Sequence, residues 1–195
     1  MKNTKTQKII GLGLFTAIVI VLQLLGSFIK FGVFSISLVL IPIVVGAALY
    51  GVGAGAWLGA VFGVVVLLQP DTALFLNLSA VGTIITVMLK GTLAGTLSGL
   101  VYKAFENKNK YVGVILASIV CPLVNTGIFL LGCRLFFYDW ILENAGGTNA
   151  FVFMITAFVG ANFLFEMATN IVLSPSIVKI INLGKKQIGT KKKVK

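Results

Sequence analysis

Three polar residues near the end of the chain are spaced so that a helix would place them on one face. Asn162, Glu166 and Asn170 follow one another at intervals of four residues inside the apolar run 151–183. Residues four apart lie on the same side of an α-helix. A carboxylate in the middle of a bilayer costs on the order of 2.5 kcal/mol or more, so it normally faces a cavity or a partner. The stripe therefore indicates either a binding cavity or an internal polar network.

Other polar residues lie at similar depths if their apolar segments cross a membrane. By helix rise from the outer side, Lys90 lies about 16 Å deep, Asn162 about 15 Å and Glu166 about 22 Å. Asn125 is near the middle of its own segment, whereas Arg134 is closer to the outer end. Opposite charges at similar depth favour a Lys90–Glu166 pair with amides around it. We therefore predict a solute cavity that opens to the outside and is lined by these side chains.

Two loops on the outer side are candidate lids for this cavity, 69–77 and 138–149. Asn77, at the end of the first loop, is a further candidate for contact with the solute. Arg134 suits a carboxylate or phosphate group, because its guanidinium presents several donors in a planar fork.

Two other functions are consistent with the same residues. In a purely structural protein, the Lys90–Glu166 pair fastens helices together, and Glu166→Gln or Asn162→Ala would destabilise the protein without altering any uptake. An intramembrane enzyme is disfavoured, because the chain has no histidine and no aspartate inside a predicted span. The chain also has no phosphate-binding loop of the Gly-x-x-x-x-Gly-Lys-Ser/Thr type. We therefore expect no ATPase activity of its own, no metal and no cofactor.

The composition identifies the class of protein that must position these side chains. The chain of 195 residues is 58% hydrophobic and 11% charged, with a mean hydropathy of +1.05. A soluble domain carries roughly a quarter charged residues. We predict an all-α integral membrane protein, with 1–184 as a single membrane domain and 185–195 as a basic cytoplasmic tail.

Six apolar segments are candidate transmembrane helices: 9–28, 36–49, 52–68, 79–105, 111–137 and 151–181. The second segment is short for a crossing and contains Pro42, which should kink it. The lysines concentrate in the two tails and one loop, so the positive-inside rule places both termini in the cytoplasm. The net charge of +11 then reflects contact with the lipid bilayer and does not indicate a nucleic-acid site.

Small residues recur every four positions along two of these segments: Gly51, Gly55, Gly59 and Gly63, and then Gly91, Gly95 and Gly99. This spacing lets membrane helices approach closely. We interpret these residues mainly as packing surfaces inside the protein.

Several motifs, taken in their order along the chain, resemble one family of membrane proteins. They are the segment 34–51 with Gly53, Gly55 and Gly59, then Pro70-Asp71-Thr72, Leu89-Lys90-Gly91, the segment 124–129, and the stripe from Asn162 to Asn170. Together they are similar to the substrate-binding S components of energy-coupling factor (ECF) vitamin transporters, in a branch common in Gram-positive bacteria. The resemblance covers residues 8–184.

The resemblance implies a function and a set of partners in the bacterial plasma membrane. An S component binds a water-soluble vitamin from outside and topples in the membrane to release it inward. Its partners are a transmembrane coupling protein and two ATP-binding subunits. The family's docking motif of small residues on the first helix maps to Gly13 and Ala17. One arginine for a carboxylate, with a lysine and amides for hydroxyl and amide groups, favours pantothenate, while riboflavin, cobalamin or another vitamin is the alternative.

Overall fold

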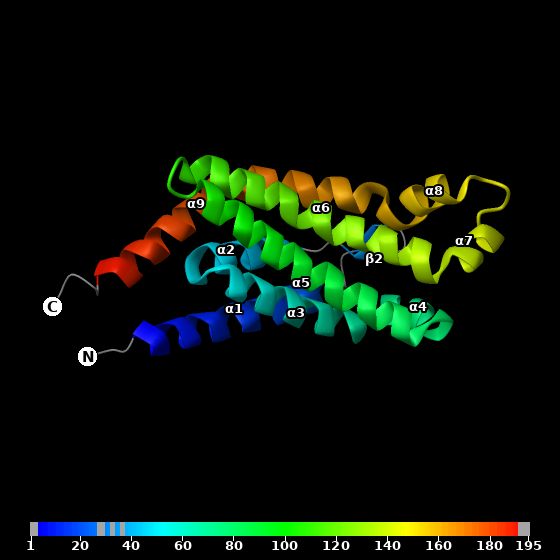
Figure 1. Cartoon of the computed structure of the whole chain (residues 1–195), viewed down its shortest axis with the longest axis horizontal. Coiled ribbons are helices and arrows are strands. Elements are labelled where there is room, and N and C mark those ends of the chain that lie inside the picture. The colour runs from blue at the N-terminus through cyan, green and yellow to red at the C-terminus, as the bar shows by residue number, and fades with distance from the viewer. Residues whose placement is uncertain (1–3, 27–29, 32–33, 36–37, 191–195) are drawn as a thin grey trace.

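The computed structural model describes residues 4–26, 30–31, 34–35 and 38–190, and almost all of these residues are helical (Figure 1). The α-helices are α1 (Thr4–Gly26), α2 (Leu40–Tyr50), α3 (Val52–Leu67), α4 (Ala73–Leu78), α5 (Ala80–Phe105), α6 (Lys110–Phe136), α7 (Tyr138–Asn144), α8 (Ala150–Phe153) and α9 (Gly160–Thr190). A 3-10 turn, η1 (Pro70–Thr72), and a π-helical turn, η2 (Met154–Val159), complete the helical elements. One short antiparallel hairpin joins β1 (Lys30–Phe31) to β2 (Phe34–Ser35). Apart from this hairpin, the predicted all-helical class is confirmed.

In the described part of the chain, four helices are long and apolar enough to cross a membrane by themselves, namely α1, α5, α6 and α9. The helix α3 and the segment Pro70–Leu78 form a fifth candidate span that is bent by 77°. The sequence predicted six crossings, and the difference lies in α2. With 11 residues, α2 is about 16 Å long, which is shorter than the roughly 30 Å of a bilayer's hydrocarbon core.

The kink predicted at Pro42 is wrong because of where α2 begins. The helix starts at Leu40, so Pro42 falls in its first turn. At that position the missing N–H of proline removes no hydrogen bond inside the helix, and the ring has no preceding turn to collide with.

The last predicted span, 151–181, is interrupted near its start. The helix α8 and the π-helical turn η2 come first, and α9 begins only at Gly160. Gly160 has a φ of +43°, a conformation that favours glycine because a side chain would be strained there. At its other end α9 passes both predicted limits, 181 and 184, and continues to Thr190.

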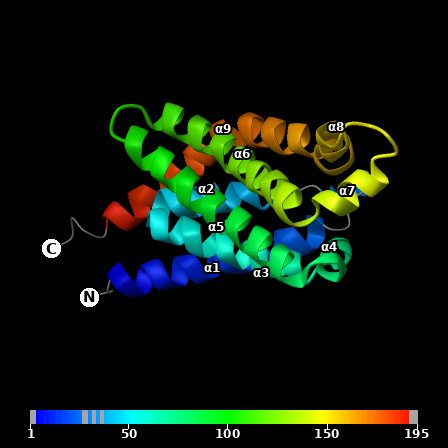
Figure 2. The same cartoon turned by 45° about the vertical axis from the view of Figure 1, so that its right-hand side comes forward.

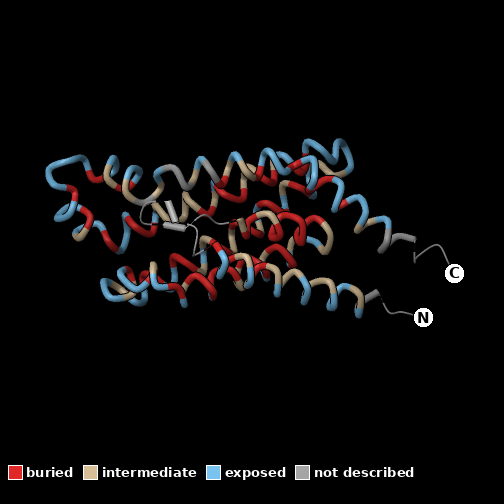
Figure 3. The backbone as a smooth tube through the Cα atoms, turned by 180° about the vertical axis from the view of Figure 1, so that it is seen from behind, coloured by how far each residue is buried: buried red, intermediate tan, exposed pale blue. Residues whose placement is uncertain are grey.

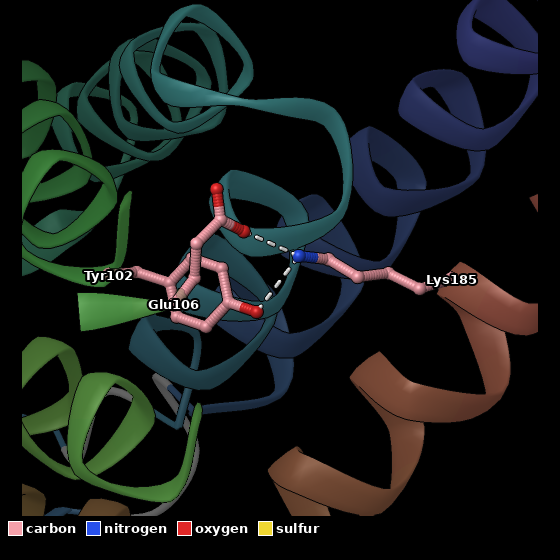
Figure 4. Close-up of polar contacts among 3 residues, drawn as sticks. All are labelled: Tyr102, Glu106 and Lys185. Atoms are coloured by element: carbon pink, nitrogen blue, oxygen red, sulfur yellow. Dashed lines mark hydrogen bonds and ion pairs between the residues drawn. The ribbon is translucent and has the colours of Figure 1, made fainter. Parts of the chain in front are cut away.

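A contact at the end of the bundle holds this extended part of α9. The Nζ of Lys185 donates to Glu106 Oε2 at 2.6 Å and to Tyr102 Oη at 3.0 Å (Figure 4). Glu106 directly follows α5, so the pair fastens the end of α9 to the end of α5. The beginning of α1 and the end of α9 lie at this same end of the bundle (Figure 1).

The backbones of α3 and α5 nearly touch, because glycines face one another along their crossing. A Cβ atom added to Gly59 or to Gly91 would collide with the backbone carbonyl of the other residue, and Gly55 and Gly95 repeat the arrangement. The two helices lie side by side in both orientations of the molecule (Figures 1 and 2). The prediction that the small residues pack inside the protein is confirmed along this crossing, but Gly51 is exposed and a Cβ atom there would meet nothing within 4 Å.

The helix α2 is the centre of the main apolar core. Leu40 and Ile43 are fully buried, and α2 contacts α1, α3, α5, α6 and α9. Buried positions face inward on the long helices, and exposed positions follow their outer sides (Figure 3). Many outer side chains are apolar, for example Leu135 and Val172, which are each 74% exposed. A lipid bilayer would cover such a surface, and water would not stabilise it.

Candidate functional site

A cavity of about 110 Å³ lies between α1, α3, α5, α6 and α9, with η1, α4 and η2 contributing to its wall. Those three elements belong to the end of the bundle away from the chain termini, where α4 and α7 lie (Figure 2). The polar residues of its described lining are Gln23, Gln69, Asp71, Thr72, Thr83, Thr86, Lys90, Asn125, Thr126 and Glu166. The aromatic ones are Phe62, Phe75, Phe129, Phe137 and Phe163. Aromatic walls with a few convergent polar groups are typical of a small-molecule site.

The fold brings three of the predicted substrate-binding residues together in this cavity: Lys90, Asn125 and Glu166. The Glu166 carboxylate acts electrostatically on Lys90. The Lys90 Nζ also lies 5.1 Å from the ring centroid of Phe129 and 5.8 Å from that of Phe62. A cation at such a distance from an aromatic face is stabilised by the ring quadrupole. The described lining thus places the Lys90 side chain beside two aromatic rings.

The other predicted substrate-binding residues are not among the described lining. Arg134 is exposed, with its guanidinium 5.8 Å from the Tyr138 ring centroid. Arg134 follows Asn125 by nine residues on α6, and this number of residues spans about two and a half turns, so the two face opposite sides. Asn77 is exposed at the end of α4. Asn162 belongs to α9, but its side chain lies outside the described residues.

A buried pair of glutamines, Gln23 and Gln69, was not among the predicted binding residues. They are only 3% and 7% exposed, respectively. The Nε2 of Gln23 donates to Gln69 Oε1 at 2.9 Å, and the Nε2 of Gln69 donates to the backbone carbonyl of Gln23 at 3.0 Å. The pair joins the end of α1 to the connection after α3. Gln23 interrupts the otherwise apolar stretch 17–26, and this interruption was a usable signal.

Three threonines of the lining differ in how their hydroxyl groups are used. Thr72 Oγ1 donates to the carbonyl of Val66 at 2.7 Å, and Thr83 Oγ1 donates to the carbonyl of Ser79 at 2.8 Å. Thr86 Oγ1 is buried without a partner among the described residues. Thr72 and Thr83 thus bind backbone carbonyls, whereas the Thr86 hydroxyl has no partner among the described residues and its side chain packs against Gly132 of α6.

The charges of the lining limit what the cavity can bind. Lys90 is the one cation in the described lining, and Asp71 and Glu166 are its acids. In the described part of the chain, no three His, Cys, Asp or Glu side chains are grouped to hold a metal ion. The lining offers a cation, hydrogen-bond acceptors and aromatic surface, a combination that suits a polar organic solute.

Comparisons with known proteins point to one family. The model for the family "ECF transporter, substrate-specific component" matches residues 7–178. The chain is 28% identical to the pantothenic acid transporter PanT of Lactococcus lactis subsp. cremoris, over 91% of this chain and 95% of that protein. Its fold is similar to a solved structure of ThiT from Listeria monocytogenes, with a TM-score of 0.65 and 20% sequence identity, covering 92% of this chain and 99% of the other. The likeness to ThiT concerns the fold alone.

Proposed function

Because this chain belongs to the family of ECF transporter substrate-specific components, we propose that it binds pantothenate and supplies it to an ATP-driven importer. Members of this family are multi-pass proteins of the bacterial plasma membrane that bind a vitamin and associate with an ECF module. The chain is thus the substrate-binding component of a vitamin transporter and not an enzyme. The choice of vitamin, the direction of transport and the identity of the partners are the proposal.

The observation that carries the choice of pantothenate is the likeness to the pantothenic acid transporter over 91% of the chain. Because that likeness extends over almost the whole chain, it includes the segments that supply the cavity wall.

The chemistry of the cavity supports this choice. Pantothenate has a carboxylate at one end, two hydroxyl groups at the other and an amide between them. Lys90 is the group that can neutralise the carboxylate. Asp71 and Glu166 accept hydrogen bonds from hydroxyl or amide groups, and they would repel a second carboxylate. We therefore infer that the ligand's carboxylate lies at Lys90 and its hydroxyl groups lie elsewhere in the cavity.

We place the six predicted helical segments in the membrane with both chain termini in the cytoplasm. The cavity then lies toward the outside, so that the vitamin enters from there and is released inward. A transmembrane coupling protein and two ATP-binding subunits are the proposed partners. Gly13 and Ala17 on α1 are the proposed docking residues, since both are exposed and a Cβ atom at Gly13 would meet nothing within 4 Å.

The test is to identify what the purified protein retains. The chain is expressed in cells grown in rich medium, purified in detergent and denatured, and the released small molecules are identified by mass spectrometry. Pantothenate is the expected ligand. Recovery of riboflavin or another vitamin in its place would contradict the choice of substrate. Recovery of no vitamin, together with no vitamin binding on addition, would support a purely structural protein.

A further inference from the structure

The hydrogen bonds between Gln23 and Gln69 fix which end of each amide faces which neighbour. The backbone carbonyl of Gln23 can only accept, so the group of Gln69 that contacts it must be the NH₂. The remaining amide atom of Gln69 is therefore its oxygen, and the group of Gln23 that contacts this oxygen must be an NH₂. Gln23 is left with its Oε1 atom, which is buried and has no partner among the described residues. Gln23 thus presents an acceptor by necessity of its other contacts.

Two further polar atoms of the same cavity share this condition. Thr86 Oγ1 on α5 and Asn125 Oδ1 on α6 are buried and have no hydrogen-bond partner among the described residues. All three residues belong to the described cavity lining. A buried polar group without a partner is destabilising, so such a group is usually completed by a water molecule or a ligand. The three residues come from three different helices, α1, α5 and α6, and line the same cavity.

We propose that Gln23 Oε1, Thr86 Oγ1 and Asn125 Oδ1 form a subsite that recognises the neutral hydrogen-bond donors of the ligand, and that Gln23 determines specificity for them. The ligand class is a small organic anion that also carries hydroxyl or amide N–H groups. Because this assignment concerns the cavity of the proposed function, it rests on that function. The assignment adds that different residues bind the two ends of the ligand: Lys90 binds the charged group, and this subsite binds the hydroxyl end.

This subsite should make the protein selective for ligands that carry hydrogen-bond donors. A site with buried acceptors discriminates against a ligand that lacks the matching donors, because the acceptors then stay unsatisfied after water is excluded. An apolar wall would discriminate far less between a ligand with these donors and a ligand without them. Gln69 contributes by holding the Gln23 amide in one orientation, and it acts as a positioning residue.

The experiment uses two probes that differ only at the hydroxyl end. These are pantothenate and its dideoxy analogue, the same acylated β-alanine without the two hydroxyl groups. Their dissociation constants are measured by calorimetric titration of the detergent-purified full chain. The variants are Gln23→Leu, Thr86→Val and the control Gln7→Leu. Gln7 lies on the same helix as Gln23 and is not part of the described cavity lining.

The expected result is a preference for pantothenate over the dideoxy analogue that Gln23→Leu reduces by about 5- to 10-fold. Thr86→Val, which preserves shape and removes only the hydroxyl group, reduces the preference in the same direction. Gln7→Leu leaves it unchanged.

Two results would overturn the assignment, and they are distinguishable. If wild-type protein binds pantothenate but Gln23→Leu and Thr86→Val keep the wild-type preference, the subsite is wrong and the proposed function stands. If wild-type protein binds neither probe, the proposed function fails and the subsite fails with it. Should Gln23→Leu show no cooperative thermal unfolding, the preference measured with Thr86→Val decides the question.

Discussion

The Lys90 ammonium lies between the rings of Phe62 and Phe129 and within the field of Glu166. An aromatic face attracts an ammonium group through the ring quadrupole, and a carboxylate attracts it through its charge. The position of the Lys90 side chain is therefore defined by its neighbours in advance of binding, which lowers the reorganisation needed when an anion arrives. The same pre-organisation makes Lys90 the residue on which recognition of a carboxylate should depend.

Substitution of Lys90 tests this dependence. The probes are pantothenate and its alcohol analogue, in which the carboxylate is replaced by a hydroxymethyl group. Wild-type protein should prefer pantothenate by about 10-fold or more, since a hydrogen bond to a charged group contributes about 1.5–3 kcal/mol. Lys90→Met should remove most of that preference. Titration of both probes measures it, and Lys103→Met on the exposed end of α5 is the control. An unaltered preference in Lys90→Met would show that another group binds the carboxylate.

The residues of the site differ in how far the sequence could reveal them. Lys90, Asn125 and Glu166 are polar residues in apolar segments, and this contrast is visible without a structure. Arg134 satisfied the same criterion, but its position on the helix turns it away from Asn125, and depth alone could not show that. The contact of Gln23 with Gln69 joins residues 46 positions apart. It depends on how α1 packs beside the end of α3, so no local pattern could predict it.

At the scale of elements, the crossing of α3 and α5 supports the side of the cavity that carries Phe62 and Lys90. Gly59 and Gly91 permit that crossing because neither has a side chain at the point of contact. The spacing of the glycines predicted a close packing surface. Which helix would use it became clear only from the structure.

Gly59→Ala should destabilise the protein by about 1–3 kcal/mol, because the new methyl group would push against the backbone of α5. The measurement is the midpoint of thermal unfolding in detergent. Gly53→Ala on the same helix is the matched control, since a Cβ atom there meets nothing within 4 Å. A midpoint of Gly59→Ala that equals the one of Gly53→Ala would show that the contact is looser than the structure indicates.

The exposed face of α1 should bind the partner module without taking part in substrate binding. Gly13→Leu places a large side chain where the chain itself has no atom within 4 Å. We expect this variant to bind pantothenate as wild-type protein does, but to lose about 10-fold or more in association with the ECF module, because overpacked interfaces are strongly destabilised. Co-purification and titration measure the two properties separately.

Val172→Leu is the control for that experiment, since Val172 is exposed on α9 and not on the proposed docking face. Equal association of Gly13→Leu and Val172→Leu with the module would exclude α1 around Gly13 from the interface.

Hydropathy located the long helices but missed the break before α9. The apolar runs located α5 and α6 to within about one residue at each end, because lipid-facing and core-facing residues are both apolar along them. The break before α9 was missed, since the segment 151–159 is itself strongly apolar and continues the same run. The break is formed by the backbone conformation of η2 and Gly160, and hydropathy does not depend on backbone conformation.

At the scale of the whole molecule, the cavity and the Lys185–Glu106 ion pair lie at opposite ends of the bundle. The cavity lies toward the end that carries η1, α4 and α7, and the fastening of Lys185 to Glu106 lies at the end where α1 begins. A ligand that fills the cavity would connect α1, α5 and α6 through Gln23, Thr86 and Asn125. Binding is therefore expected to stabilise the arrangement of the bundle as well as to select the solute.

Titration of the purified chain with pantothenate, with riboflavin as comparison, tests whether the chain is a pantothenate-binding protein. We predict saturable binding of one pantothenate per chain, and a rise in the unfolding temperature when pantothenate is present in excess of its dissociation constant. Riboflavin should produce neither effect. Saturable binding of riboflavin without binding of pantothenate would contradict the account, as would the absence of binding by a protein that still unfolds cooperatively.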